Sequence, residues 1–222
     1  MDTAVVDVLA GLLSLDGPWE FAIEPRPRWR RPADIELDRM IEVPFAPETA
    51  RSGVGNTGLY GGCWYRRRLA LPPIGPEERL LLHFNAVDYE ASVWVSGVLV
   101  AYHEGGYTPF SCDITDLVAT DGCCEIVVQA LDDPLDLAKP RGKQDWRPEP
   151  HSIWYPRTTG IWQTVWCERV PTTRIGQLQW NTNLERWEVG MHARIVGGDG
   201  RDLRLRLRLR AGGELITEDV YA

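Results

Sequence analysis

The chain has 222 residues, a formal charge of −8 and ten tryptophans. This length suffices for one large or two modest domains with a buried core. The acidic balance argues against a nucleic-acid partner, because phosphate binding requires a basic face. No apolar run approaches the roughly 20 residues that a membrane-spanning helix needs. Composition favours the tryptophans as core residues of a β-sandwich over a lining for a sugar groove.

The first residues, 1–13, predict a short helix or strand that leads into the domain. Asp2 and Asp7 stand where a secretory signal peptide would carry a basic region. The five cysteines are an odd number at scattered positions, unlike a disulfide framework, and the chain has no Asn-x-Ser/Thr sequon. Together these features predict a cytoplasmic location.

Short segments typical of β-strands then follow one another, with Gly, Pro and Asp between them. The clearest lie within 85–116, where Ala91 and Val93 occupy one face of a strand and Ser96-Gly97 predicts a tight turn. Strands without intervening helices indicate an antiparallel sandwich rather than a parallel α/β sheet. We expect strands near 18–24, 40–44, 63–71, 79–86, 90–96, 98–103, 109–113, 124–132 and 162–170.

Two long loops interrupt this pattern, at 25–36 and 132–157. Long loops in a compact domain are usually functional or disordered, and the second contains too much apolar surface for disorder. Pro171 marks a domain boundary. Beyond it, leucines alternate with arginines over 203–210, which predicts a strand with one buried and one solvated face. A solvated face is a better reading of these arginines than a polyanion site.

Most motifs that would carry chemistry are missing or out of context. The Gly-x-Gly-x-x-Gly run at 53–58 lies between a Pro-containing loop and a strand, so it predicts a turn-rich loop and not a dinucleotide site. The four histidines are far apart and no Cys-x-x-Cys occurs, so no metal site is predicted. Nothing pairs two carboxylates at the separation that glycoside hydrolysis requires.

Sugar binding is better supported, because the 132–157 segment combines aromatic, acidic, amide and cationic side chains. Two readings remain open. In one, these side chains contact carbohydrate. In the other, Arg141 and Lys143 pair with nearby acids and Trp146 anchors the loop to the sandwich. The candidate carbohydrate-binding residues are Asp132, Asp133, Arg141, Lys143, Gln144 and Trp146.

An ordered set of motifs makes residues 15 to about 170 similar to the N-terminal part of glycoside hydrolase family 2, which includes β-galactosidases, β-glucuronidases and β-mannosidases. The most specific is Gly-Gly-Tyr-Thr-Pro-Phe at 105–110. The complete set lies at 15–21, 43–44, 64–67, 82–88, 93–97, 105–110, 113–115, 140–144 and 155–166.

This resemblance implies an all-β architecture with two domains. Residues 1–170 are expected to form a jelly-roll sandwich of the galactose-binding type. Residues 171–222 are expected to begin an immunoglobulin-like sandwich, at about half the ~100 residues of such a domain. In the family, a catalytic (β/α)₈ barrel follows, and its acid/base glutamate comes after an asparagine. This sequence contains no Asn-Glu dipeptide.

The resemblance therefore implies a truncated, non-catalytic chain, without cofactor or metal, whose parent is a retaining β-glycosidase. Its expected role is to bind carbohydrate and position substrate beside the barrel, with 132–133 and 141–144 closest to the substrate. An autonomous carbohydrate-binding module and a purely structural buttress for the barrel remain as alternatives. Because 172–222 lacks a partner sheet, this segment is also expected to associate, as in a homodimer, or to stay partly disordered. The alternative is that its strands fold back onto the jelly roll.

Overall fold

The computed structural model describes residues 12–26, 28, 31–198 and 203–221. The element expected at 1–13 falls outside these ranges except for its end, which belongs to β1 (Leu12–Ser14). The chain divides into two compact units, Met1–Val170 and Pro171–Ala222. None of the described helices is long and apolar enough to cross a membrane.

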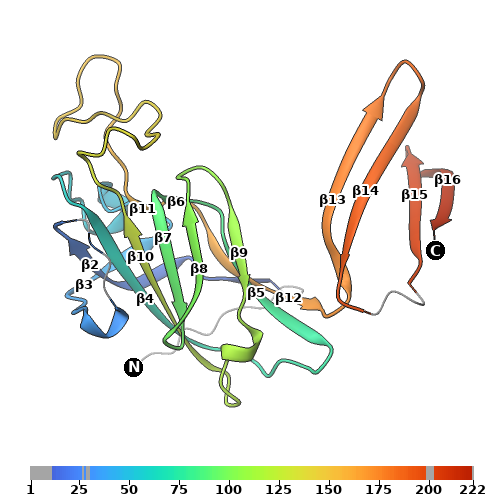
Figure 1. Cartoon of the computed structure of the whole chain (residues 1–222), viewed down its shortest axis with the longest axis horizontal. Helices are drawn as coiled ribbons and strands as arrows, with labels where there is room; N and C mark the ends of the chain where they lie inside the picture. Colours follow the sequence, from blue (N-terminus) through green and yellow to red (C-terminus); the bar gives the residue numbers. More distant parts are fainter. Residues whose placement is uncertain (1–11, 27, 29–30, 199–202, 222) are drawn as a thin grey trace. The chain divides into compact units, whose positions relative to one another are not determined.

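The first unit is an antiparallel β-sandwich, which confirms the predicted fold class (Figure 1). Its larger sheet has six strands in the order β3-β2-β4-β10-β7-β8, and its smaller sheet has four in the order β1-β12-β5-β9. The strands of the larger sheet are β2 (Gly17–Glu24), β3 (Arg39–Val43), β4 (Gly62–Ala70), β7 (Glu90–Val95), β8 (Val98–Glu104) and β10 (Cys123–Leu131). Those joining β1 in the smaller sheet are β5 (Glu78–Phe84), β9 (Phe110–Asp113) and β12 (Val165–Pro171). Short 3-10 turns connect some of them, at Pro32–Asp34, Ala50–Ser52 and Thr115–Leu117.

Alternation along the strands produces the core between the two sheets. On β5, Leu80, Leu82 and Phe84 point inward, and on β10 Ile126 and Val128 do the same, while the residues between them lie on the other face. Burying each large apolar side chain stabilises the fold by roughly 1.5–3 kcal/mol. Aromatic residues fill the centre, where Phe21 packs edge-on against Tyr65 with ring centroids 5.0 Å apart.

A second, smaller apolar cluster covers the outer face of the larger sheet. Trp64 on β4 stacks on Trp94 of β7, with ring centroids 5.6 Å apart. Ala22 and Val127 complete the cluster. Ile35 from the predicted 25–36 loop and Leu37 just after it pack against the cluster. These tryptophans are therefore core residues, as composition indicated.

One end of the sandwich is closed by a very short pair of strands. Residues Val87–Asp88 form β6 and residues Gly160–Ile161 form β11, with Gly160 opposite Asp88. The backbone N–H of Ile161 donates to Tyr65 Oη at 3.1 Å, which ties this pair to the core. This pairing places Asp88 beside the end of the 132–157 segment.

The second unit consists of two β-hairpins in separate sheets. The first pairs β13 (Arg174–Asn183) with β14 (Glu188–Val196), and the second pairs β15 (Leu205–Ala211) with β16 (Glu214–Tyr221). Arg206 and Arg208 share Glu218 on the solvated face of the second hairpin. The alternating leucines at 205, 207 and 209 occupy the other face, where Leu209 is 40% exposed.

Replacement of Gly160 by alanine tests how tightly this end is packed. Gly160 has a φ of +79°, and a Cβ there would collide with Tyr65 Oη and lie 2.8 Å from Cys63 Sγ. Gly53 has the same φ of +79° with open space around it. We expect Gly53→Ala to cost about 1–2 kcal/mol of unfolding free energy and Gly160→Ala about 2–5 kcal/mol. Chemical denaturation of both variants measures this, and equal losses would contradict it.

Candidate functional site

The 132–157 segment leaves the sandwich at the end of β10 and returns just before β11. It contains one isolated bridge, between Gln144 and Tyr155. Around this bridge the backbone N–H of Asp145 donates to Tyr155 O at 2.8 Å, and that of Tyr155 donates to Lys143 O at 2.9 Å. These bonds close the segment into an ordered loop that rests on a polar network.

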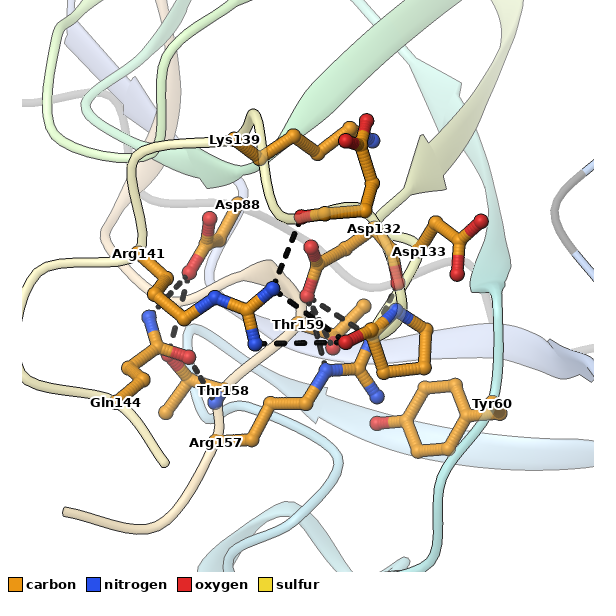
Figure 2. A network of polar contacts seen from close by, with 12 residues as sticks. Tyr60, Asp88, Asp132, Asp133, Lys139, Arg141, Gln144, Arg157, Thr158 and Thr159 are labelled. Carbon is orange, nitrogen blue, oxygen red and sulfur yellow. Dashed lines mark hydrogen bonds and ion pairs between the residues drawn. The ribbon is translucent and has the colours of Figure 1, made fainter. Parts of the chain in front are cut away.

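The centre of that network is an ion pair between Arg157 and Asp132 (Figure 2). Nε of Arg157 donates to Asp132 Oδ2 at 3.0 Å, and Nη2 lies 2.9 Å from the same oxygen and also donates to the Asp132 carbonyl. The guanidinium carbon lies 5.0 Å from the centroid of the Tyr60 ring. Both charged side chains are largely buried. Because Asp132 begins the segment and Arg157 ends it, the pair joins the two ends of the segment.

A second carboxylate, Glu48, meets the network from the loop before β4. Tyr60 Oη donates to Glu48 Oε1 at 2.5 Å, and the backbone N–H of Thr159 donates to Oε2 at 3.2 Å. Burial raises the pKa of Glu48, against the opposing effect of the Tyr60 hydrogen bond. Burial also raises the pKa of Tyr60, so this hydroxyl stays a donor.

A third carboxylate, Asp88, comes from β6. Gln144 Nε2 donates to Asp88 Oδ2 at 2.8 Å, and Thr158 Oγ1 approaches the same oxygen at 3.4 Å. The amide oxygen of Gln144 accepts the backbone N–H of Thr158 at 2.8 Å. Burial raises the pKa of Asp88 to about 6, and the nearby charge of Asp132 adds to this effect. The Gln144 side chain therefore serves to hold the segment on β6.

The cations of the segment have different roles. Arg141 donates to the carbonyl oxygens of Asp136, at 2.9 Å, and Pro134, at 3.4 Å, so it braces the loop through backbone acceptors. Lys139 forms an ion pair with Glu90 at 2.7 Å. Lys143 is exposed.

The network leaves almost no interior space. The hollow that its side chains line encloses about 10 Å³. That is close to the volume of a single water and far below what a sugar ring needs. Nη1 of Arg157 is buried beside it, with no hydrogen-bond partner among the described residues. Within the described part of the chain, no group of His, Cys, Asp or Glu side chains is arranged to hold a metal ion. The side chains of the network thus fill its interior and hold the loop in place.

Aromatic and aliphatic side chains lie on the solvent-exposed surface of the same loop. Trp146 is 47% exposed, Tyr155 62% and Ile153 70%. Trp146 contacts Trp154 edge-on, with ring centroids 5.5 Å apart. Exposed aromatic rings of this kind are a common platform for carbohydrate, because a pyranose ring packs its C–H face against them.

The six candidate carbohydrate-binding residues do not form a single site in the structure. It brings Asp132, Arg141 and Gln144 into one network, where each is occupied by internal bonds. Asp133 accepts the backbone N–H of Leu135 at 2.9 Å and so shapes a turn. Lys143, between Arg141 and Gln144, is exposed, and so is Trp146.

The sequence interpretation missed several partners in this network. Asp88 and Arg157 both lie in family motifs, at 82–88 and 155–166, but no pattern indicated that they belong to one network. Their opposite charges were the available signal. Glu48 and Tyr60 follow the Val-Pro motif at 43–44, where only a turn-rich loop was predicted.

Comparison with known proteins now decides the family. Residues 42–135 match the family model described as "Glycosyl hydrolases family 2, sugar binding domain". These residues belong to the sugar-binding domain of glycoside hydrolase family 2. The β-glucuronidase of Rattus norvegicus is 27% identical over 236 residues, covering 91% of this chain. A β-galactosidase from Thermoanaerobacter pseudethanolicus is 30% identical over 112 residues, covering 50% of this chain.

Solved structures share the fold of the sugar-binding domain and its neighbouring hairpins. A Faecalibacterium prausnitzii β-glucuronidase superposes with a TM-score of 0.72 at 22% identity, over 98% of this chain and 40% of that enzyme. A Bifidobacterium dentium β-glucuronidase, complexed with coumarin-3-O-glucuronide, gives a TM-score of 0.71 at 19% identity, over 97% of this chain and 41% of its own. The chain spans 36% of the rat enzyme and 14% of the Thermoanaerobacter enzyme.

Asp88 should make the stability of the domain depend on pH. Its pKa is about 6 in the folded state against an ordinary value of 3.8, so between these values the folded state holds a proton that the unfolded state has lost. Stability from this group therefore falls as pH rises through that window, by about 2–3 kcal/mol at 1.36 kcal/mol per pKa unit. Asp88→Asn keeps the acceptor for Gln144 and cannot ionise.

We expect the unfolding free energy of Asp88→Asn, relative to wild type, to rise by that amount between pH 4 and pH 6.5. Urea denaturation across this range measures the difference. A constant difference would show that Asp88 ionises normally in the folded domain.

Proposed function

We propose that this chain supplies the non-catalytic, substrate-positioning part of a family 2 glycoside hydrolase that cleaves O-glycosidic bonds. The observation that carries the proposal is the loop at 132–157, whose exposed aromatic side chains stand on the Arg157–Asp132 network. In this role, Asp132, Arg141 and Gln144 hold the loop. Asp133, Lys143 and Trp146 are the residues nearer to substrate.

The partner in this proposal is a catalytic barrel in the same, longer protein, a retaining β-glycosidase. The β-glucuronidase and β-galactosidase relatives support β-glycosides as substrates. The absence of an Asn-Glu dipeptide supports a chain that carries no acid/base glutamate of its own. The five cysteines, all free, support a reducing compartment such as the cytoplasm.

A structural role without sugar affinity is the second candidate, because the polar network is filled by its own side chains. In that case the loop would only buttress the barrel. An autonomous carbohydrate-binding module is the third. Sugar binding by the chain itself separates these readings.

We expect the chain to bind methyl β-D-glucuronide or methyl β-D-galactoside weakly, with a Kd of about 1 mM or above, because each hydrogen bond to a solvated hydroxyl contributes only about 0.5–1.5 kcal/mol. Trp146→Ala should weaken binding by about tenfold or more. Trp187→Ala is the matched control, since Trp187 is 93% exposed in the turn between β13 and β14. NMR titration measures the affinities, and aryl glycosides added to the same samples should release no aglycone. Tight binding that survives Trp146→Ala, or turnover that purifies with the chain, would contradict the proposal.

The second unit suggests a further partner, a second copy of the chain. Trp180, Leu209 and Ile216 belong to a set of half-exposed apolar side chains on its hairpins. Each large apolar side chain gains roughly 1.5–3 kcal/mol on burial, and strand edges invite pairing with another chain. We therefore propose that 172–222 mediates homodimer formation.

This association is expected to appear as a mass that rises with concentration in size-exclusion chromatography with light scattering. Hydrogen exchange over 172–222 should slow as the dimer forms. A strict monomer with well-protected amides throughout this segment would rule the proposal out.

A further inference from the structure

Asp145 and His151 form a tightly held carboxylate–imidazole pair within the 132–157 loop. The Asp145 side chain is completely buried. Its Oδ2 accepts the backbone N–H of His151 at 2.7 Å and lies 2.6 Å from His151 Nδ1. Its Oδ1 accepts the backbone N–H of Arg147 at 3.1 Å. One carboxylate thus closes the turn from 145 to 151 and fixes the imidazole ring.

The pair also fixes which ring nitrogen carries the proton. Burial opposes the charge on Asp145, but the hydrogen bonds from His151 and Arg147 outweigh it, and the pKa of Asp145 is lowered. An ionised carboxylate only accepts hydrogen bonds, so Nδ1 of His151 is the protonated nitrogen. Nε2 lies on the other side of the ring from Asp145. In the neutral ring it is an acceptor, and in the imidazolium it is a donor.

This second nitrogen is available to a ligand. The His151 side chain is 34% exposed, and no described residue forms a hydrogen bond with Nε2. Trp146 lies against the imidazole with ring centroids 5.4 Å apart and planes at 84°. An exposed indole therefore stands beside a polar atom whose position and protonation are set by a buried carboxylate. A pyranose presents the matching surface, with a C–H face for the indole and hydroxyls at its rim.

We propose that His151 is a sugar-contacting residue of this loop, with Nε2 bonding a hydroxyl of a glycoside whose ring packs against Trp146. Asp145 is the positioning residue that orients the imidazole. The inference rests on the proposed function, because its ligand is the carbohydrate of the same loop. It adds a specificity determinant that no sequence pattern indicated.

Two substitutions separate the contact from the structural role of the ring. His151→Asn places an amide N–H near the position of Nδ1, so it can still donate to Asp145, but it has no group at Nε2. His151→Gln places an amide near Nε2. His192→Asn is the matched control, an exposed histidine on β14 in the second unit. Thermal unfolding of each variant checks that the loop stays folded.

The probe is methyl β-D-glucuronide, titrated by NMR into the full chain, with methyl β-D-galactoside as the comparison ligand. We expect His151→Asn to weaken binding about three- to tenfold, the effect of one hydrogen bond. His151→Gln should recover part of this loss, and His192→Asn should bind as wild type does. Nitrogen-15 shifts of the wild-type ring should report a protonated Nδ1, and the Nε2 shift should move on titration.

The outcomes distinguish this inference from the proposed function. If wild type binds neither glycoside, sugar binding by the chain fails and the inference fails with it. If wild type binds and Trp146→Ala weakens binding while His151→Asn does not, the proposed function stands and the role of His151 is wrong. Equal losses for His151→Asn and His151→Gln, or an Nε2 shift that ignores the sugar, would also overturn it.

Discussion

The Arg157 guanidinium is the one group on which the candidate site depends, because it provides the buried positive charge among three carboxylates. Glu48, Asp88 and Asp132 come near it from three different parts of the chain. Asp132 bonds it directly, and the other two have raised pKa values because burial is not fully compensated. Removing such a cation would leave unpaired buried charges, which is far more costly than losing a surface ion pair. The position of the long loop thus follows from an electrostatic requirement of the sandwich end.

This constraint explains why the loop has two unlike surfaces. Most polar groups of its inner surface are bonded to the sandwich, to backbone carbonyls or to each other, and the hollow that they line encloses only about 10 Å³. Its outer surface exposes indole, phenol and aliphatic groups that would normally be buried. A rigid support lowers the entropy that an exposed aromatic group loses when a ligand orders it. The inner network therefore supports the exposed aromatic side chains on the outer surface of the loop.

The sandwich could be read from the sequence because its strands are long enough to show alternation. Residues 90–95 and 123–131 are examples, and both were placed within a residue or two. The site could be read only in part. Asp88 and Thr158 are 70 residues apart and meet through β6 and β11, which have two residues each. Strands this short carry no periodic signal, so composition located the loop but could not show which of its polar residues face inward.

The small apolar cluster on the outer face of the larger sheet limits which surfaces of such a domain can contact a new ligand. Trp64 and Trp94 are buried there, with Ile35 and Leu37 packed against the cluster, so neither indole is exposed to a ligand. The 132–157 loop, in contrast, is held to the sandwich by a few polar contacts. The Arg157–Asp132 pair joins its two ends, Gln144 bonds Asp88 of β6, and Lys139 pairs with Glu90 of β7. The loop can therefore be exchanged as a unit. A loop of different length or composition that keeps the Arg157–Asp132 pair could bring a new specificity to the same sandwich without repacking its core.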